Sequence, residues 1–204
     1  MIAIIDYGVG NLFSLQSSFA MIGAEAVVTG DPAVIRAADH VILPGVGAFE
    51  DAAKKLRAAG LDDVVRQEAT RGKPVLGICL GMQLLFQRSY EFGCHEGLGL
   101  IPGEVMDMTP ELPAGLKVPH IGWNALHLTK PDHPLWKYIR PEDCVYFVHS
   151  FYAKGCGDAL LATAEYGVEL TAAVGDGNVL GCQFHPEKSG SVGLNILRAF
   201  CEMR

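Results

Sequence analysis

The sequence predicts an α/β fold of three layers, in which a mainly parallel sheet is flanked by helices and the second half is rich in β-structure. Short apolar runs alternate with amphipathic segments up to about residue 88, and beyond residue 97 short β-type segments are separated by Gly and Pro. Alternating strands and helices are typical of parallel sheets, because each helix returns the chain to the start of the next strand. With 204 residues, half of them hydrophobic, we expect one domain over residues 1–204.

The first two strand–helix units are marked by turn and capping residues. Residues 2–6 form a short apolar strand, and the next helix carries apolar side chains at steps of three and four, with Asn11 as its N-cap. Residues 26–29 form the second strand. Asp31 and Pro32 then open a helix with a capping side chain and a proline in its first turn.

Two further strands complete the first half. The third strand covers residues 41–43 and is followed by a helical pattern over residues 48–70. The fourth covers residues 74–78, and a helix is expected from residue 80 to about residue 88. These four strands, each followed by a helix, make up the parallel part of the predicted sheet.

The second half is expected to be β-rich. Strands are predicted at residues 103–108, 124–128, 144–150 and 160–165. A hairpin is predicted next, with strands over residues 172–174 and 179–184 on either side of a turn that contains Asp-Gly. The last segment, residues 190–204, is predicted to be an amphipathic helix.

Composition and charge exclude several classes of protein. The formal net charge is -7 and no run of Lys or Arg is present, which argues against a nucleic-acid partner. No apolar run approaches the roughly 20 residues of a membrane span, and the apolar start lacks the basic leader of a signal peptide. We therefore expect a cytoplasmic protein with no membrane partner. The six cysteines include no C-x-x-C pair, so neither a disulfide framework nor a zinc site is predicted.

The stretch G-I-C-L-G-M-Q around Cys79 lies between a predicted strand and a predicted helix. Glycines around a nucleophile in this context permit a tight, strained turn, the nucleophile elbow, which points the side chain away from the sheet. The backbone N–H of Leu80 would then lie at a helix N-terminus, where it favours a thiolate and can donate to an oxyanion. The alternative is a packing residue in a core turn, since free cysteine is often buried.

A thiol nucleophile needs a base, and the base needs a group that orients it. His185 and Glu187 offer both in the segment Q-F-H-P-E, directly after the second strand of the predicted hairpin. Pro186 ends the strand ladder after His185, which suits a site at the edge of the sheet where the strands end. Taken alone, His-Pro-Glu could equally be a solvated loop.

Two glycine-rich turns are candidate binding loops. The segment P-G-V-G-A at residues 44–48 can bring backbone N–H groups to a carbonyl oxygen and so provide the second half of an oxyanion hole. A plain strand-to-helix turn is the alternative. The G-V-G at residues 8–10 hints at phosphate binding, but Phe13 occupies the third glycine position of a nucleotide-binding fingerprint, so a turn is favoured.

Together these stretches resemble the class I glutamine amidotransferases, in which a Cys-His-Glu triad hydrolyses glutamine. G-I-C-L-G-M-Q and the distant H-P-E carry the resemblance to the class. Four further stretches are similar to the glutaminase subunits of imidazole glycerol phosphate synthases: D-Y-G-V-G-N at 6–11, P-G-V-G-A-F at 44–49, P-H-I-G-W-N at 119–124 and F-H-P-E-K-S at 184–189. The resemblance spans nearly the whole chain and implies a flavodoxin-like sheet.

The resemblance implies a role for each matching residue. Cys79 attacks the side-chain carboxamide of glutamine to form a glutamyl thioester, His185 relays the proton to the leaving ammonia, and Glu187 holds the imidazole. The implied glutamine-binding residues are Gly47, Gln83, Glu91, Ser150 and Phe151, the last two through their backbone.

Activity is implied to depend on a signal from a partner. In the family, the peptide around Val46 and Gly47 reorients and completes, with Leu80, the oxyanion hole. Such a step would make hydrolysis conditional on the partner. No metal or organic cofactor is implied, and His120 and His149 are expected to be structural or gating residues rather than metal ligands.

The implied partner is a (β/α)₈-barrel cyclase subunit that receives ammonia through an internal tunnel. The complex would make imidazole glycerol phosphate and an aminoimidazole carboxamide ribonucleotide in histidine biosynthesis. Asn11, Trp123 and Lys188 are the candidate interface residues. The family match implies that Lys188 forms an ion pair with the partner, while a tryptophan beside Gly122 and Asn124 is typical of an interface but could also be a core residue. We expect a heterodimer, because this chain has no length left for a synthase.

Three alternatives remain open. The chain could serve a different synthase, such as that of the pyridoxal phosphate pathway, although P-H-I-G-W-N argues against this. It could be a noncatalytic module that kept the fold, although all three triad residues are present. It could also be a free-standing cysteine hydrolase, which would turn over without a partner.

Overall fold

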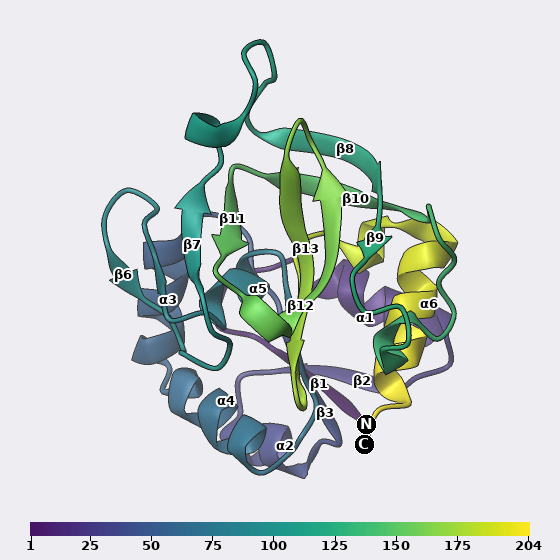
Figure 1. Cartoon of the computed structure of the whole chain (residues 1–204). Coiled ribbons are helices and arrows are strands. Elements are labelled where there is room, and N and C mark those ends of the chain that lie inside the picture. Colours follow the sequence, from purple (N-terminus) through teal and green to yellow (C-terminus); the bar gives the residue numbers. More distant parts are fainter.

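One eight-stranded sheet forms the centre of the protein (Figure 1). The computed structural model describes residues 1–204. The strands lie in the order β2 (Ala26–Thr29), β1 (Ile2–Ile5), β3 (His40–Leu43), β4 (Val75–Ile78), β14 (Val179–Cys182), β13 (Glu169–Asp176), β12 (Leu160–Glu165) and β9 (His127–Leu128). The pairings from β2 to β14 are parallel, and those from β14 to β9 are antiparallel. The predicted α/β fold with a mainly parallel, flavodoxin-like sheet is confirmed.

Helices cover both faces of the sheet and give the predicted three layers (Figure 1). One face carries α1 (Leu12–Met21) and α6 (Gly190–Cys201). The other carries α2 (Pro32–Ala37), α3 (Phe49–Ala58) and α4 (Leu61–Thr70). Because alternate side chains of a strand point to opposite faces, Ile4 packs in the core that contains Phe19, and Ile5 in the core that contains Phe49. The sheet therefore separates two hydrophobic cores.

Two smaller sheets accompany the central one. The first has the order β11 (Phe151–Lys154), β7 (Glu104–Asp107), β5 (Arg88–Ser89) and β6 (His95–Glu96). The second pairs β10 (Cys144–His149) with β8 (His120–Ala125) in an antiparallel register. Sequence analysis did not predict β5, β6 or β11: β5 and β6 have only two residues each and leave no periodic pattern, and only Ser150 separates β11 from the strand before it, β10.

The two predicted helix caps behave differently. The side chain of Asp31 accepts a hydrogen bond from the N–H of Ala33 at 2.8 Å, and Pro32 is the first residue of α2, so this cap is confirmed. Asn11 stands directly before α1, but its side chain makes no capping hydrogen bond. The prediction of Asn11 as a side-chain cap is therefore wrong, and the amide is free for another contact.

The predicted helix over residues 48–70 is interrupted. Gly60 adopts a left-handed φ of 66° and separates α3 from α4. Glycine tolerates this conformation because it lacks a Cβ, so it readily ends a helix. The apolar pattern continues through the break, which is why periodicity predicted one helix instead of two.

Other boundaries also differ from the predicted ones. The helix α5 covers only Leu80–Leu84, and β5 already begins at Arg88. The predicted strand over residues 124–128 is wrong, since β8 ends at Ala125 and a separate strand, β9, follows. The hairpin is confirmed as β13 and β14, with a turn shorter than predicted.

Glycines allow α5 to pack directly against the end of β3. A Cβ on Gly81 would lie 1.8 Å from the carbonyl oxygen of Leu43, and a Cβ on Gly45 would lie 2.6 Å from the backbone nitrogen of Gly81. Neither overlap could be relieved by a side-chain rotation, because both involve backbone atoms. This close approach brings the turn before α5 next to the loop after β3.

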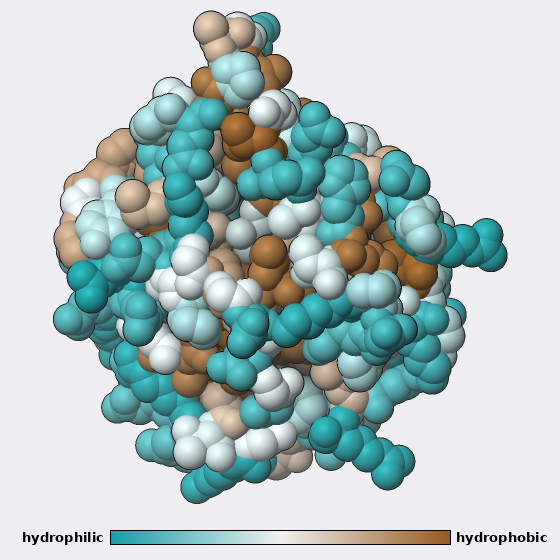
Figure 2. All heavy atoms as spheres, in the orientation of Figure 1, coloured by the Kyte–Doolittle hydropathy of each residue, from teal (hydrophilic) through white to brown (hydrophobic).

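Most of the visible surface is polar. In Figure 2, hydrophobic side chains appear in small areas between hydrophilic ones. The most exposed large hydrophobic side chains are Phe92, Phe13, Met21, Ile121 and Trp123. None of the helices is both long enough and apolar enough to cross a membrane.

Candidate active site

Cys79 occupies a strained turn between β4 and α5. Its backbone has φ 54° and ψ -113°, a conformation that residues other than glycine rarely adopt. The N–H of Cys79 donates to the carbonyl of Cys182 on β14 at 2.8 Å, which ties the turn to the neighbouring strand. This is the geometry that sequence analysis predicted for a nucleophile elbow.

His185 and Glu187 form a buried pair directly after β14. Nδ1 of His185 lies 2.8 Å from Oε1 of Glu187, and the two side chains are only 3% and 1% exposed. The hydroxyl of Ser189 donates to the carbonyl of His185 at 2.6 Å and holds this segment in place. Because β14 is hydrogen-bonded to β4, the imidazole reaches the same edge of the sheet as Cys79.

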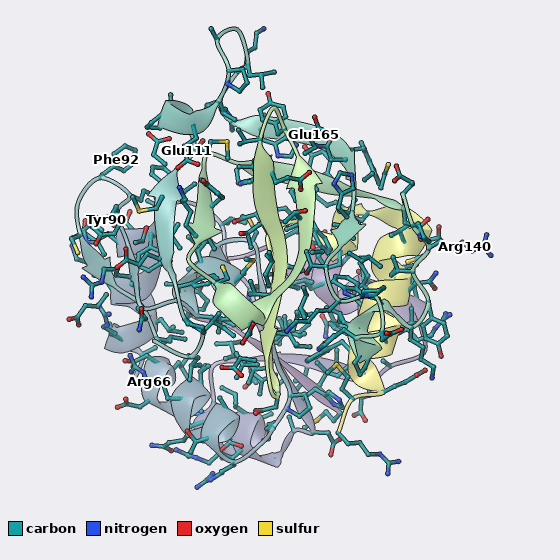
Figure 3. All side chains as sticks on the ribbon, viewed as in Figure 1. Arg66, Tyr90, Phe92, Glu111, Arg140 and Glu165 are labelled. Carbon is teal, nitrogen blue, oxygen red and sulfur yellow. The ribbon has the colours of Figure 1, made fainter.

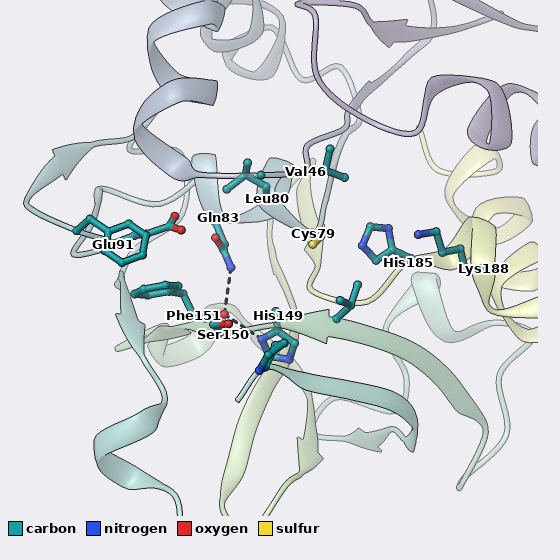
Figure 4. A pocket seen from close by; sticks show the side chains of 14 residues that line it. Val46, Cys79, Leu80, Gln83, Glu91, His149, Ser150, Phe151, His185 and Lys188 are labelled. Atoms are coloured by element: carbon teal, nitrogen blue, oxygen red, sulfur yellow. Dashed lines mark hydrogen bonds between the residues drawn. The ribbon is translucent and has the colours of Figure 1, made fainter. Parts of the chain in front are cut away.

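A cavity of about 390 Å³ opens at this edge and contains both groups (Figure 4). Its lining includes most of the residues predicted for the site: Cys79, His185, Val46, Gly47, Leu80, Gln83, Glu91, Ser150, Phe151 and Lys188. Glu187 lies behind His185, outside the lining. Asn11 and Trp123 do not line the cavity either.

The comparison with known proteins identifies the family. A family model described as "Glutamine amidotransferase class-I" matches residues 3–203. The chain belongs to the class-I glutamine amidotransferase family. The family predicted from the motifs around Cys79 and His185 is therefore confirmed.

Relatives of this glutamine amidotransferase share about half of its residues. Three of them are each named imidazole glycerol phosphate synthase subunit HisH. The relative from Lacticaseibacillus casei is 51% identical and the match covers 100% of this chain and 96% of the relative. The relative from Sulfurimonas denitrificans is 50% identical, and the match covers 100% of this chain and 99% of the relative. The relative from Caldanaerobacter subterraneus subsp. tengcongensis is 48% identical, and the match covers 100% of this chain and 98% of the relative.

Solved structures share the fold at much lower sequence identity. A structure described as "Crystal structure of glutamine amidotransferase" has a TM-score of 0.77 and 20% identity, over 100% of this chain and 98% of that chain. The structure of PurLQS from Thermotoga maritima has a TM-score of 0.75 and 19% identity, over 98% of this chain and 96% of that chain. At these identities the likeness establishes the amidotransferase fold alone.

The charge of His185 is set by its neighbours. Burial opposes the imidazolium, but the side chains of Cys79 and Glu187 outweigh burial and raise the pKa of His185 to about 9. The second carboxylate oxygen of Glu187, Oε2, is buried without a hydrogen-bond partner. With its pKa raised in this way, the imidazole of His185 carries a proton at neutral pH in this amidotransferase.

Replacing Glu187 by Gln is expected to destabilise the fold in a pH-dependent way. Since the folded-state pKa of His185 is raised from 6.5 to about 9, its charged form stabilises the protein fully below pH 6.5, and this contribution disappears as the pH rises toward 9. Glu187→Gln removes one cause of the shift, so the loss of stability is largest at low pH, at about 1.4 kcal/mol per pKa unit removed. Urea unfolding at about pH 6 and about pH 9.5 measures it.

Glu25→Gln serves as the control, because Glu25 is exposed and makes no ion pair. It should leave stability nearly unchanged at both pH values. A destabilisation by Glu187→Gln that stays the same at both values would contradict the ion pair.

Gln83 presents a hydrogen-bond acceptor to the cavity. Its amide nitrogen donates to the carbonyl of Phe151 at 3.1 Å (Figure 4) and to Oε1 of Gln183 at 3.0 Å. Both N–H bonds are therefore used within the protein, and the atom left for a ligand is the oxygen. An amide or ammonium group of the ligand is the partner that such an oxygen can bind.

Glu91 lies across the cavity from His185 and is held by the first residue of α3 (Figure 4). Its Oε2 accepts a hydrogen bond from the N–H of Phe49, the first residue of α3, at 2.7 Å. Burial raises the pKa of the Glu91 carboxyl. One oxygen is thus fixed by α3, which leaves the other for a ligand.

Four lining residues were not among the predicted site residues: Phe92, Pro119, Val148 and His149. Phe92 is 87% exposed, has a φ of 52° and lies on the loop between β5 and β6, at the outer edge of the molecule (Figure 3). Its ring meets that of Phe151 edge to face, with centroids 6.0 Å apart. In the sequence, only its place next to Glu91 could have indicated that Phe92 lines the site, because a lone Phe is not part of any chemical motif.

His149 lines the cavity and His120 packs against it from behind the lining. Nδ1 of His120 lies 3.1 Å from Nε2 of His149, and Nδ1 of His149 lies 2.9 Å from the carbonyl of Phe151. Burial lowers the pKa of His120 to about 4 and that of His149 to about 3, so both rings are neutral at physiological pH.

Proposed function

We propose that this chain is the glutaminase subunit of an imidazole glycerol phosphate synthase in histidine biosynthesis, acting as one domain over residues 1–204. The observation that supports the chemistry best is Cys79 on a strained turn in the same cavity as His185, which is paired with Glu187. The names of relatives that match the full chain at about 50% identity support the choice of synthase.

The proposed reaction begins with the Cys79 thiolate and the His185 imidazolium. The sulfur attacks the carboxamide carbon of glutamine, a C–S bond forms, and the C–N bond breaks as the nitrogen takes a proton from His185. Water then gives a proton to His185 and attacks the thioester, the C–S bond breaks, and glutamate leaves. Glu187 keeps the imidazole in the orientation that both proton transfers need.

The oxyanion formed in each step needs hydrogen-bond donors. The N–H of Leu80 follows Cys79 directly, and Gly47 lines the same cavity from the loop after β3. Gly47 has a φ of 89°, and no atom lies within 4 Å of the position where a Cβ would be. A glycine with this freedom can turn its peptide toward the ligand, and we propose that the partner subunit controls this movement.

The proposed partner is a cyclase subunit with a (β/α)₈ barrel, which would receive the ammonia. Trp123 on β8 is 55% exposed and its ring lies 6.0 Å from that of Tyr146 on β10. The ammonium group of exposed Lys188 lies 5.9 Å from the Tyr146 ring. These side chains join an exposed aromatic surface to the edge of the cavity, and with Asn11 they form the proposed heterodimer interface.

Glutamate release by the purified chain tests the proposal. We expect slow release from glutamine by the chain alone, and a rise of about 100-fold when a cyclase subunit and its nucleotide substrate are added. Fast release that does not respond to the partner would identify an independent hydrolase. No release with any cyclase would refute the glutaminase function.

A further inference from the structure

Gln183 is a fully buried polar residue that the mechanism above does not use. It follows β14, two residues before His185, and its side chain is 0% exposed. Its amide nitrogen lies 3.7 Å from Sγ of Cys79, and its Oε1 accepts the hydrogen bond from Gln83 at 3.0 Å. An N–H that points at a sulfur anion favours the anion over the thiol.

The orientation of this amide follows from a backbone carbonyl. The oxygen of Phe151 can only accept, so the atom of Gln83 that lies 3.1 Å from it is the nitrogen. The same nitrogen faces Gln183, so the atom of Gln183 on that side is the oxygen. The nitrogen of Gln183 therefore has to face Cys79.

The carbonyl at the start of this chain of contacts is itself held in place. Phe151 is the first residue of β11 and pairs with Asp107 of β7. Its oxygen also accepts a hydrogen bond from Nδ1 of neutral His149 at 2.9 Å. Neither amide can rotate by 180° without placing two acceptors or two donors against each other, which is costly in a buried site.

We propose that Gln183 is a further catalytic residue, whose N–H donates to Sγ of Cys79 and stabilises the attacking thiolate. The inference rests on the proposed glutaminase function for its biological meaning, but the hydrogen bond can be tested without glutamine. Gln83 and the carbonyl of Phe151 act through Gln183, as positioning groups that keep its donor toward the sulfur.

The test is the pH dependence of Cys79 alkylation by iodoacetamide, which reports the thiolate directly. Cys79 is reached through the cavity, whereas Cys94 and Cys144 are exposed and will react as well, so the modified peptide that contains Cys79 has to be quantified by mass spectrometry. The Met side chain of Gln183→Met is similar in length to Gln but has no side-chain N–H. In this variant we expect the midpoint of the pH profile of Cys79 alkylation to rise by about one pH unit. Alkylation near pH 7 should then be about tenfold slower.

Gln16→Met is the matched control. Gln16 also donates its amide to a backbone carbonyl, that of Ala26 at 3.2 Å, but it does not line the cavity. Its alkylation profile should match that of the unmodified protein.

Gln183→Glu is a second variant that keeps the oxygen facing Gln83 and places the other oxygen against Cys79. It should raise the midpoint further, because a carboxylate repels the thiolate. If Gln183→Met does not fold, this variant decides the question. An unchanged profile in either variant, with a cooperative thermal transition, would overturn the proposal. A shifted profile in a protein that never releases glutamate would leave the Gln183 donor standing and refute the glutaminase function instead.

Discussion

Cys79→Ala is expected to lower glutamate release by about 10⁴-fold or more, which is the scale of loss when a triad nucleophile is removed from other hydrolases. Without the sulfur no thioester can form, and water would have to attack the amide directly. The measurement is glutamate release with the cyclase subunit and its nucleotide substrate present, so that the unmodified protein is fully active.

Cys156→Ala is the matched control, because Cys156 is also buried and reduced but lies outside the cavity lining. It should keep most of the activity. Residual activity of Cys79→Ala above about one per cent of the unmodified rate would contradict the role of Cys79 as the nucleophile.

Gly81→Ala is expected to cost more than about 3 kcal/mol of the free energy of unfolding, which exceeds the usual cost of overpacking a core. The added Cβ would lie 1.8 Å from the carbonyl oxygen of Leu43, so either α5 or the end of β3 has to move. Both segments hold parts of the cavity, and activity should fall together with stability. Urea unfolding of the purified variant measures the change.

Gly23→Ala is the control, because it measures the cost of backbone strain without a steric overlap. Gly23 has a φ of 74° and no atom lies within 4 Å of the position of its Cβ, so the substitution adds strain but no collision. It should cost about 1–2 kcal/mol. A cost for Gly81→Ala no larger than that for Gly23→Ala would show that α5 adjusts freely to the extra methyl group.

The sequence was sufficient to predict the four parallel strands of the first half of the fold. Strand β2 and the cap of α2 agree with the prediction, because apolar runs and the Asp-Pro pair act locally and the sequence displays them. The residues proposed for the triad were recognisable for the same reason. Cys79 lies between two glycines, and His185 and Glu187 are two residues apart, so each motif is contained in a few positions.

Features that depend on contacts between distant segments were missed. The strand β11 exists because residues 151–154 pair with residues 104–107. Gln183 is the clearest example in the site. As a sequence position it is a polar residue after a strand, and only its contacts with Gln83 and Cys79, about one hundred positions away, give it a role.

The position of β14 in the sheet has a consequence for biosynthesis of the protein. Residues 179–182 form β14, which pairs with β13 directly before it in the chain and with β4, which was made about one hundred residues earlier. Pairing over about one hundred residues closes a long loop, which is an entropically unfavourable and slow event in folding. Cys79 emerges from the ribosome long before His185, so a nascent chain holds a thiol without its base. With the proposed triad, hydrolysis of glutamine has to wait until residues 179–187 have been made and β14 has docked beside β4.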